Sequence, residues 1–271
     1  MGVPKHAFFR LRNKWTKSLP SRRPGPVNTL LSTEQVLVFF LHLRHYLPFL
    51  LIGMIFNTTR KVISSTVNNT LTFFDNYLSP QISLGTLESR MRECVHFFQT
   101  PITFLMDGTE QKIHSSANIF HENNFFSSKK KQHSITLLLI ISPKGRIIYL
   151  SLCYFGSIVD KELLHRTMHE WAPQLRLEWG MADSGFDGQR ARRELNILTP
   201  LHSHDHPMYK LFSTIRIRVE NVIAKLKVFE CLHQEVREPI IGNSDLLQKH
   251  TTRWRIVASL HNHKIDNYNK L

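Results

Sequence analysis

Cysteine is scarce in this 271-residue sequence, with three residues in all. Cys94, Cys153 and Cys231 are far apart and odd in number, so they form neither a disulfide framework nor the spacing of a metal finger. This usage favours a reducing compartment. Acidic residues are also few: 21 Asp and Glu stand against 35 Lys and Arg, which gives a net charge of +14. Such a charge suits a polyanionic partner, although a basic globular protein without a nucleic-acid role has the same composition.

The sequence also lacks an uninterrupted apolar run of membrane-spanning length. Its most hydrophobic stretch, Val36 to Phe56, is interrupted by His42, Arg44, His45 and Pro48. No clean run of about twenty apolar residues is left, so we interpret this stretch as a pair of core helices and expect no membrane association. A secretory signal, internal repeats and low-complexity tracts are absent as well.

The first 28 residues are basic and contain no acid. Seven cations precede the first acidic residue, Glu34: Lys5, Arg10, Arg12, Lys14, Lys17, Arg22 and Arg23. We expect residues 1–28 to be a disordered arm that contacts DNA phosphates or serves as a nuclear-import signal. A flexible solvated tail without a partner is an equal alternative. On the first interpretation the protein works in the nucleus, with a cytoplasmic stage before import.

Residues 29–95 are expected to form a small helical module. Leu50 to Phe56 predicts one helix, Asn57 to Thr59 a short polar turn with a cap, and Arg60 to Phe74 a second helix. Polar residues gather on one side of the second helix: Arg60, Lys61, Ser64, Ser65 and Asn68. This outline is typical of a helix-turn-helix, whose DNA contacts we expect from Arg60, Lys61, Ser64 and Asn68. A generic helical hairpin is the alternative.

Three acidic residues occupy places where a metal-binding carboxylate is useful. Asp107 follows the apolar residues of a predicted buried strand, and Asp183 follows the strand-like stretch from Leu177 to Ala182. Glu220 lies inside a predicted helix. Two strand-end aspartates and one helical glutamate can converge on a pair of divalent cations, an arrangement suited to phosphodiester chemistry. We therefore take these three residues as candidate catalytic and metal-binding residues.

The predicted helix around Glu220 carries a second signal. Its apolar residues recur on one face at i, i+4, i+7 and i+11: Ile215, Val219, Val222 and Leu226. Arg216, Glu220 and Lys227 are four and seven residues apart and share a neighbouring face. A carboxylate between two cations suits a metal ion beside a phosphate, so we expect Arg216 and Lys227 to contact DNA. An ordinary salt-bridged helix surface is the alternative.

Residues 96–271 are expected to form an α/β domain. Strand-rich runs at residues 132–141 and 145–152 follow the strand that leads to Asp107, and helices then alternate with strands up to the Glu220 helix. Three strands followed by helix, strand, helix, strand and helix is the order of an RNase H-like fold, a mixed sheet with flanking helices. In that fold the first and fourth strands are neighbours, which would bring Asp107 and Asp183 together.

Four short motifs follow one another along the chain. Their residues are Asp107 to Glu110; Gly156, Ser157 and Asp160; Ala182, Asp183, Gly185 and Phe186; and Arg216, Glu220 and Lys227. In this order they resemble the motifs of DDE transposases of the PIF/Harbinger superfamily and of the nucleases derived from them, over roughly residues 30 to 265. Ser213 and Phe186 stand where that family has tyrosine, which affects substrate contacts but no carboxylate.

The resemblance implies a metal-dependent DNA endonuclease or transposase. In that family Asp107, Asp183 and Glu220 would hold two Mg²⁺ or Mn²⁺ ions and cleave DNA at transposon ends or related sites. The resemblance also implies a helix-turn-helix at the predicted module, a separate Myb-like DNA-binding partner and a homo-oligomer. Two alternatives stay open: a nuclease without strand transfer, and a host-recruited DNA-binding protein that makes no catalytic use of the site.

Two polar features beside these motifs have competing interpretations. Asp160 is interpreted as part of a capping box on a helix that begins at Ser157, and a fourth metal-site acid is the alternative. Lys129, Lys130 and Lys131 form a charge run. Such a run is usually solvated, but the resemblance would place it beside the substrate groove.

Overall fold

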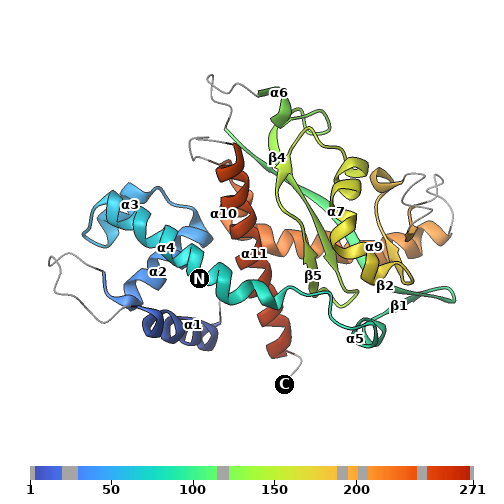
Figure 1. Ribbon diagram of the computed structural model, residues 1–271, viewed down its shortest axis with the longest axis horizontal. Coiled ribbons are helices and arrows are strands. Elements are labelled where there is room, and N and C mark those ends of the chain that lie inside the picture. The colour runs from blue at the N-terminus through green and yellow to red at the C-terminus, as the bar shows by residue number, and fades with distance from the viewer. Residues whose placement is uncertain are drawn as a thin grey trace. The chain divides into compact units, whose positions relative to one another are not determined.

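The computed structural model describes residues 4–19, 30–114, 122–187, 195–200, 207–236 and 243–268. The chain forms two compact units. Unit 1 comprises Met1–Pro80, Lys227–Gln234 and Thr252–Leu271, and unit 2 comprises Gln81–Leu226 and Glu235–Thr251. Figure 1 labels many of the elements of each unit.

The described part of unit 1 is helical. Its elements are α1 (Lys5–Ser18), α2 (Ser32–His45), α3 (Phe49–Ile55), α4 (Arg60–Leu78), the short turn η1 (Ser79–Gln81) that leads into unit 2, α10 (Glu230–His233) and the second part of α11 (Asn243–Tyr268). Aromatic rings fill its core. Phe39 of α2 stacks on Phe74 of α4 with ring centroids 5.0 Å apart, and both side chains are fully buried. The expected helical module is therefore present.

Helix α1 lies within the segment expected to be a disordered arm. Its apolar side chains share one face and are buried: Ala7, Phe8, Leu11 and Trp15. Trp15 Nε1 also donates a hydrogen bond to Gln35 Oε1 of α2 at 3.0 Å. The expectation of disorder is wrong for Lys5–Ser18, because burial of this face offsets the entropy of ordering the helix. Residues 1–3 and 20–28 of the expected arm lie outside the described residues.

The most hydrophobic stretch of the sequence forms two separate helices, as predicted. Helix α2 ends at His45, Tyr46 has a left-handed φ of 48°, and Pro48 precedes α3. A left-handed residue and a proline both interrupt helical hydrogen bonding, so the stretch divides at this point. Within the described ranges, no helix combines the length and the hydropathy that crossing a membrane requires.

Helices α3 and α4 have the predicted helix-turn-helix outline. Thr59 caps α4, since its Oγ1 accepts a hydrogen bond from the Val62 N–H at 3.3 Å. Gly53 lies against the turn, where a Cβ would stand 2.8 Å from the carbonyl oxygen of Thr58. Helix α4 buries Ile63, Val67, Thr70, Leu71, Phe74 and Leu78. This burial leaves its polar side free to face outward.

Helix α11 differs from the sequence-based domain division, which assigned residues 96–271 to one domain. Its second part belongs to unit 1. Arg255 forms an ion pair with Asp75 of α4, with Nε and Oδ1 2.9 Å apart, and the Arg253 guanidinium lies 5.6 Å from the centre of the Tyr46 ring. These partners are some two hundred residues away along the chain, so local sequence patterns do not reveal them.

Unit 2 contains a mixed sheet. Its strands are β1 (Val95–Phe97), β2 (Thr100–Lys112), β3 (Phe126–Ser127), β4 (Gln132–Ile141), β5 (Ile147–Leu150), β6 (Tyr154–Phe155), β7 (Trp179–Met181) and β8 (Asn196–Leu198). Its helices are α5 (Leu87–Arg92), α6 (Glu122–Phe125), α7 (Asp160–Leu175), the short η2 (Ser184–Phe186), α9 (Pro207–Lys227), which ends at the boundary with unit 1, and the first part of α11.

The strand order confirms the RNase H-like fold. The main path is β3-β4-β2-β7-β8, with β1 paired to β2 and with β5 and β6 paired to β4. Strand β2 runs antiparallel to β4 and parallel to β7, and β7 runs parallel to β8. The first long strand, β2, thus lies beside β7, as the order of elements predicted.

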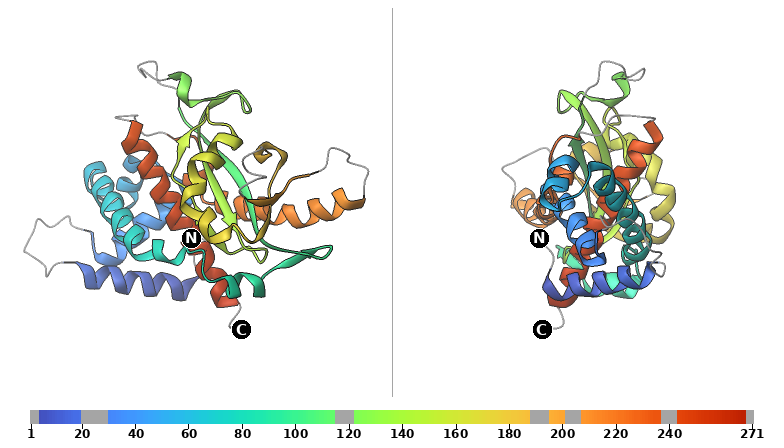
Figure 2. Two further views of the ribbon diagram at one scale, coloured as in Figure 1. Left: turned by 45° about the vertical axis from the view of Figure 1, so that its right-hand side comes forward. Right: turned by 90° about the vertical axis from the view of Figure 1, so that its left-hand side faces the viewer.

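The core of unit 2 lies between the sheet and α7. Leu163, Met168 and Trp171 of α7 belong to the same buried cluster as Phe104 and Met106 of β2. Figures 1 and 2 show α7 lying across the sheet. In β7, a Cβ on Gly180 would stand 2.0 Å from the Phe104 ring, so glycine is needed for this close packing.

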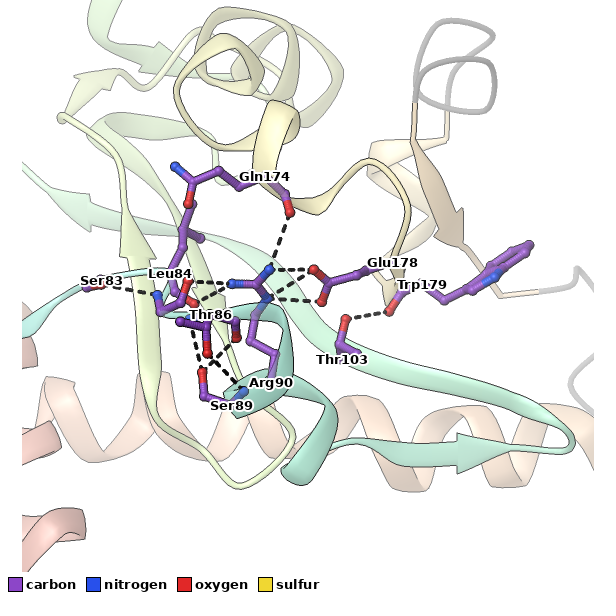
Figure 3. A network of polar contacts seen from close by, with 10 residues as sticks. Ser83, Leu84, Thr86, Ser89, Arg90, Thr103, Gln174, Glu178 and Trp179 are labelled. Carbon is purple, nitrogen blue, oxygen red and sulfur yellow. Dashed lines mark hydrogen bonds and ion pairs between the residues drawn. The ribbon is translucent and has the colours of Figure 1, made fainter.

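A buried ion pair connects α5 to the start of β7. Arg90 and Glu178 are each 4% exposed, and the guanidinium donates to both carboxylate oxygens. The same guanidinium donates to the carbonyl oxygens of Leu84, Gly85 and Gln174, at 2.7, 2.9 and 3.3 Å. Figure 3 shows these contacts around one arginine. Since Glu178 directly precedes β7, the network holds the strand that leads to Asp183.

Candidate functional site

Asp107 and Asp183 lie at the same level of two neighbouring strands. The parallel pairing of β2 and β7 ends at Leu105 and Met181. Asp107 is two residues beyond Leu105, and Asp183 is two residues beyond Met181, so both aspartates follow the last paired residues. Strand β2 itself continues to Lys112 against β4, whereas the sequence suggested a strand that ended at Asp107. Beyond Leu105, β2 no longer pairs with β7.

Each aspartate has one oxygen bound to the following backbone. Asp107 Oδ1 accepts a hydrogen bond from the Gly108 N–H at 2.8 Å, and Asp183 Oδ1 accepts one from the Ser184 N–H at 2.8 Å. Asp183 is the N-cap of η2. These local bonds restrict the rotation of both carboxyl groups and leave a second oxygen on each for other partners.

Arg216 of α9 connects the acids. One guanidinium nitrogen hydrogen-bonds Glu220 Oε1 at 2.5 Å, one helical turn away, and another lies 3.9 Å from Asp183 Oδ2. The positive charge of Arg216 also acts on Asp107, whose pKa it lowers. Carboxylates from β2, from the end of β7 and from α9 therefore share the field of one cation.

Burial raises the pKa of Asp107 to about 6. The charge of Arg216 and the Gly108 N–H lower this pKa, whereas the negative charges of Asp183 and Asp160 raise it. Desolvation and like charges both disfavour the ionised form of a carboxyl group. An added cation beside these carboxylates would lower the pKa again and restore the charge of Asp107.

We expect Asp107→Asn to stabilise the metal-free protein near neutral pH. The pKa of Asp107 lies at about 6 in the folded protein against 3.8 ordinarily, so its contribution to stability falls as the pH rises from about 4 to about 6. A shift of this size corresponds to on the order of 3 kcal/mol. Asparagine stays neutral and removes this cost. Thermal unfolding of both proteins in EDTA at several pH values measures the gain, and a gain that is equal at low and neutral pH would contradict the prediction.

The donor set fits a hard divalent cation. Asp107, Asp183 and Glu220 offer carboxylate oxygens, the ligands that Mg²⁺ prefers. Asp160 adds a fourth carboxylate, whose negative charge acts on Asp107. In the described ranges, no three His, Cys, Asp or Glu side chains are grouped closely enough to hold one ion. The guanidinium of Arg216 lies between Asp183 and Glu220 at this point. Metal binding by the three acids stays a prediction.

The other expected DNA contacts lie in two places. Lys227 is the last residue of α9, seven positions after Glu220, and belongs to unit 1. The polar side of α4 lines an open depression of about 650 Å³ with Arg60, Lys61, Ser64, Ser65, Asn68 and Asn69. The residues that we selected on α4 thus share one surface, and their contact with DNA stays a prediction.

Asp160 has a different role from the one that its neighbours in the sequence suggest. Helix α7 begins at Asp160 with Val159 as its N-cap, so the capping box expected from Ser157 is wrong. The Asp160 carboxylate instead forms an ion pair with Lys129, whose Nζ lies 3.1 Å from Oδ2. Its negative charge also raises the pKa of Asp107. The sequence contains one related signal, since Gly108 and Gly185 closely follow the two candidate aspartates. In the structure both glycines lie against the Asp160 carboxylate.

One comparison with known proteins finds a family that matches much of the chain. The family model described as DDE superfamily endonuclease matches residues 106–262. No curated protein matches the chain. The crystal structure of a pre-cleavage Mos1 transpososome is similar at 10% identity over 92% of this chain and 82% of that chain, but a TM-score of 0.24 carries no argument. The matched segment covers more than half of the sequence and contains all three acids, so the chain belongs to the DDE superfamily endonuclease family.

Proposed function

We propose that the protein is a metal-dependent DNA endonuclease of the PIF/Harbinger type. The observation that supports this proposal is the convergence of Asp107, Asp183 and Glu220 on the field of Arg216, within the segment that matches the endonuclease family. The net charge of +14 favours a polyanionic substrate such as DNA. The proposed substrate is a transposon end or a related site, and the proposed location is the nucleus.

The three acids share one task in this proposal, which is to bind metal ions. Asp107 and Asp183, from neighbouring strands, and Glu220, from α9, would hold two Mg²⁺ or Mn²⁺ ions through carboxylate oxygens. When bound, such a pair of ions supplies an activated water and stabilises the leaving 3′ oxygen. The local hydrogen bonds from Gly108 and Ser184 keep the two aspartates oriented.

Arg216 has a separate task, which is to make a phosphate stable beside the negative charges of the carboxylates. Its guanidinium lies beside Asp183 and Glu220, where it offsets their repulsion of a phosphodiester. An arginine can donate to phosphate oxygens through charge-assisted hydrogen bonds, which strengthen as negative charge develops. We therefore assign Arg216 to the scissile phosphate and keep Lys227 as an expected DNA contact.

A cleavage assay tests the proposed function. Duplex DNA that carries candidate terminal repeats is incubated with the full chain in Mg²⁺ or Mn²⁺ and compared with the same reaction in EDTA. The assay is repeated with a Myb-like partner protein, because family resemblance suggests one, and the mass of the complex shows whether the protein acts as a homo-oligomer. Cleavage that depends on the divalent cation supports the proposal.

We expect α4 to contribute DNA affinity without contributing chemistry. Alanine at both Arg60 and Lys61 removes two exposed cations from the polar surface of α4. If both contact phosphates, the salt dependence of binding should flatten by up to about two units of slope. Binding titrations over a range of salt concentrations measure this slope. Arg60→Lys with Lys61→Arg is the matched control, which keeps both charges and should keep the slope; unchanged binding of the alanine variant would identify an ordinary solvated surface.

A further inference from the structure

The Asp160 carboxylate is seated against the backbone of both aspartate-bearing segments. A Cβ on Gly185 would stand 2.3 Å from Asp160 Oδ2, and a Cβ on Gly108 would stand 3.0 Å from Oδ1. Gly108 directly follows Asp107, and Gly185 lies two residues after Asp183. The two glycines therefore leave room for a third aspartate beside the candidate catalytic pair.

Lys129 reaches this carboxylate from a constrained turn. It lies in the turn that joins β3 to β4, where the buried Ser127 Oγ accepts a hydrogen bond from the Lys130 N–H at 3.2 Å and Lys131 has a φ of 50°. Its ammonium lies 3.1 Å from Asp160 Oδ2. The Asp160 side chain is 19% exposed and that of Lys129 is 64% exposed, so the carboxylate is enclosed while the lysine stays open to solvent.

The charge of Lys129 also acts on the catalytic pair. Burial by itself would lower the pKa of Lys129. The charge of Asp160 and the hydrogen bond to it raise this pKa, and the charges of Asp107 and Asp183 raise it further, so that it lies above its ordinary value. Lys129 therefore keeps its proton at the edge of the acidic site. Arg216 and Lys129 are two cations that share this site with four carboxylates, those of Asp107, Asp160, Asp183 and Glu220.

We propose that Lys129 binds a phosphate of the DNA strand at the catalytic site and that Asp160 is the positioning residue that holds its ammonium there. This inference rests on the proposed nuclease function and extends it to a residue of the β3–β4 turn. The long side chain of an exposed lysine without a partner would spread its charge over many positions, whereas the Asp160 carboxylate, fixed between two glycines, holds the Lys129 ammonium in one. A phosphate can bind the exposed side of the same ammonium.

The effect of Asp160→Asn on DNA affinity separates this role from a simple acidic surface. Loss of a negative charge near DNA normally strengthens binding, because repulsion of the phosphates falls. If Asp160 positions Lys129, the same change should weaken binding, by about fivefold at moderate salt, the size expected for one lost phosphate contact. The probe is a fluorescently labelled duplex of the DNA that the wild type cleaves, titrated in EDTA so that no metal ion contributes.

Lys129 variants complete the test. Lys129→Ala should weaken binding to a similar extent and lower the salt slope by about one unit, and Lys129→Arg should retain both. In the Lys129→Ala background, Asp160→Asn should no longer weaken binding and should strengthen it slightly. In the Lys130→Ala background, used as the control from the same turn, Asp160→Asn should weaken binding as in the wild type. In Mg²⁺ the Lys129→Ala variant should raise KM more than it lowers kcat.

Gly185→Ala offers a second route to the same result. The three heavy atoms nearest to the added methyl group all belong to Asp160, so the methyl group should displace that carboxylate and reproduce the weaker binding. Combined with Asp160→Ala, the Gly185→Ala change should have no further effect. This variant keeps the test valid if Asp160→Asn folds poorly.

The possible results distinguish the inference from the function on which it rests. If the wild type binds and cleaves DNA while Asp160→Asn binds more tightly, or if Lys129→Ala leaves the salt slope unchanged, the inference is overturned and the nuclease function stands. If Asp160→Asn removes the thermal stabilisation that Mn²⁺ gives the wild type, Asp160 is a metal ligand and the inference is also overturned. If the wild type neither binds nor cleaves DNA, the proposed function fails and the inference fails with it.

Discussion

Asparagine at Asp107 or Asp183, or glutamine at Glu220, is expected to abolish metal-dependent DNA cleavage. Each change removes one charged oxygen ligand and leaves Arg216, Lys129 and the α4 surface in place. Loss of several kcal/mol of transition-state stabilisation corresponds to a rate on the order of a thousandfold lower. Since the three acids share one site, a single change should be nearly as severe as all three together.

DNA affinity should respond in the opposite direction. In EDTA the same three variants should bind DNA as tightly as the wild type or slightly more tightly, because negative charge near the phosphate is reduced. Glu162→Gln is the matched control: this exposed acid of α7 pairs with Arg166 and belongs to no part of the site. Its substitution should change neither cleavage nor binding.

Two results would contradict the assignment of the three acids. If one variant retains wild-type cleavage, that residue does not belong to the catalytic set. If the wild type binds its DNA, with its partner present, but cleaves under no divalent cation, the chain is a recruited DNA-binding protein that makes no catalytic use of the site.

The sheet and its two aspartates were predictable because they follow from local patterns. Apolar runs and turn residues mark the strands, and the order of elements specifies which strands are neighbours. The parallel pairing of β2 with β7 then brings Asp107 near Asp183. The ion pair of Arg216 with Glu220 was predictable for the same reason, because residues four apart on a helix are neighbours on its surface.

The features that the sequence did not reveal depend on partners far along the chain. Asp160 resembles a helix cap when only its neighbours are considered, and its partner Lys129 lies 31 residues away. The ion pair of Arg255 with Asp75 spans 180 residues and assigns the second part of α11 to unit 1. Helix α1 was not predicted for another reason. Its basic residues indicated a disordered arm, although its apolar residues share one face of a helix.

A second large effect is expected at the buried pair of Arg90 and Glu178. Arg90→Ala or Glu178→Ala should destabilise unit 2 by about 3–5 kcal/mol, since each leaves an uncompensated charge in a site that is 4% exposed. Arg90→Ala also removes the donor to the carbonyl oxygens of Leu84, Gly85 and Gln174. Urea unfolding, followed by tryptophan fluorescence, measures the loss as a lower midpoint; Trp171 and Trp179 report on unit 2, and Trp15 and Trp254 on unit 1. The loss should also reduce cleavage, because Glu178 precedes the strand that leads to Asp183.

The exposed pair of Arg92 and Glu88 provides the control on the same helix, α5. Both side chains are 75% exposed and one turn apart, so alanine at either should change stability by less than about 0.5 kcal/mol. The double variant Arg90→Met with Glu178→Leu tests the physical cause. It removes both charges and keeps similar side-chain volumes, so it should be more stable than either single alanine variant, although the three carbonyl oxygens still lack their donor. If Arg90→Ala costs no more than Arg92→Ala, the pair does not hold the start of β7, and the position of Asp183 must depend on the sheet alone.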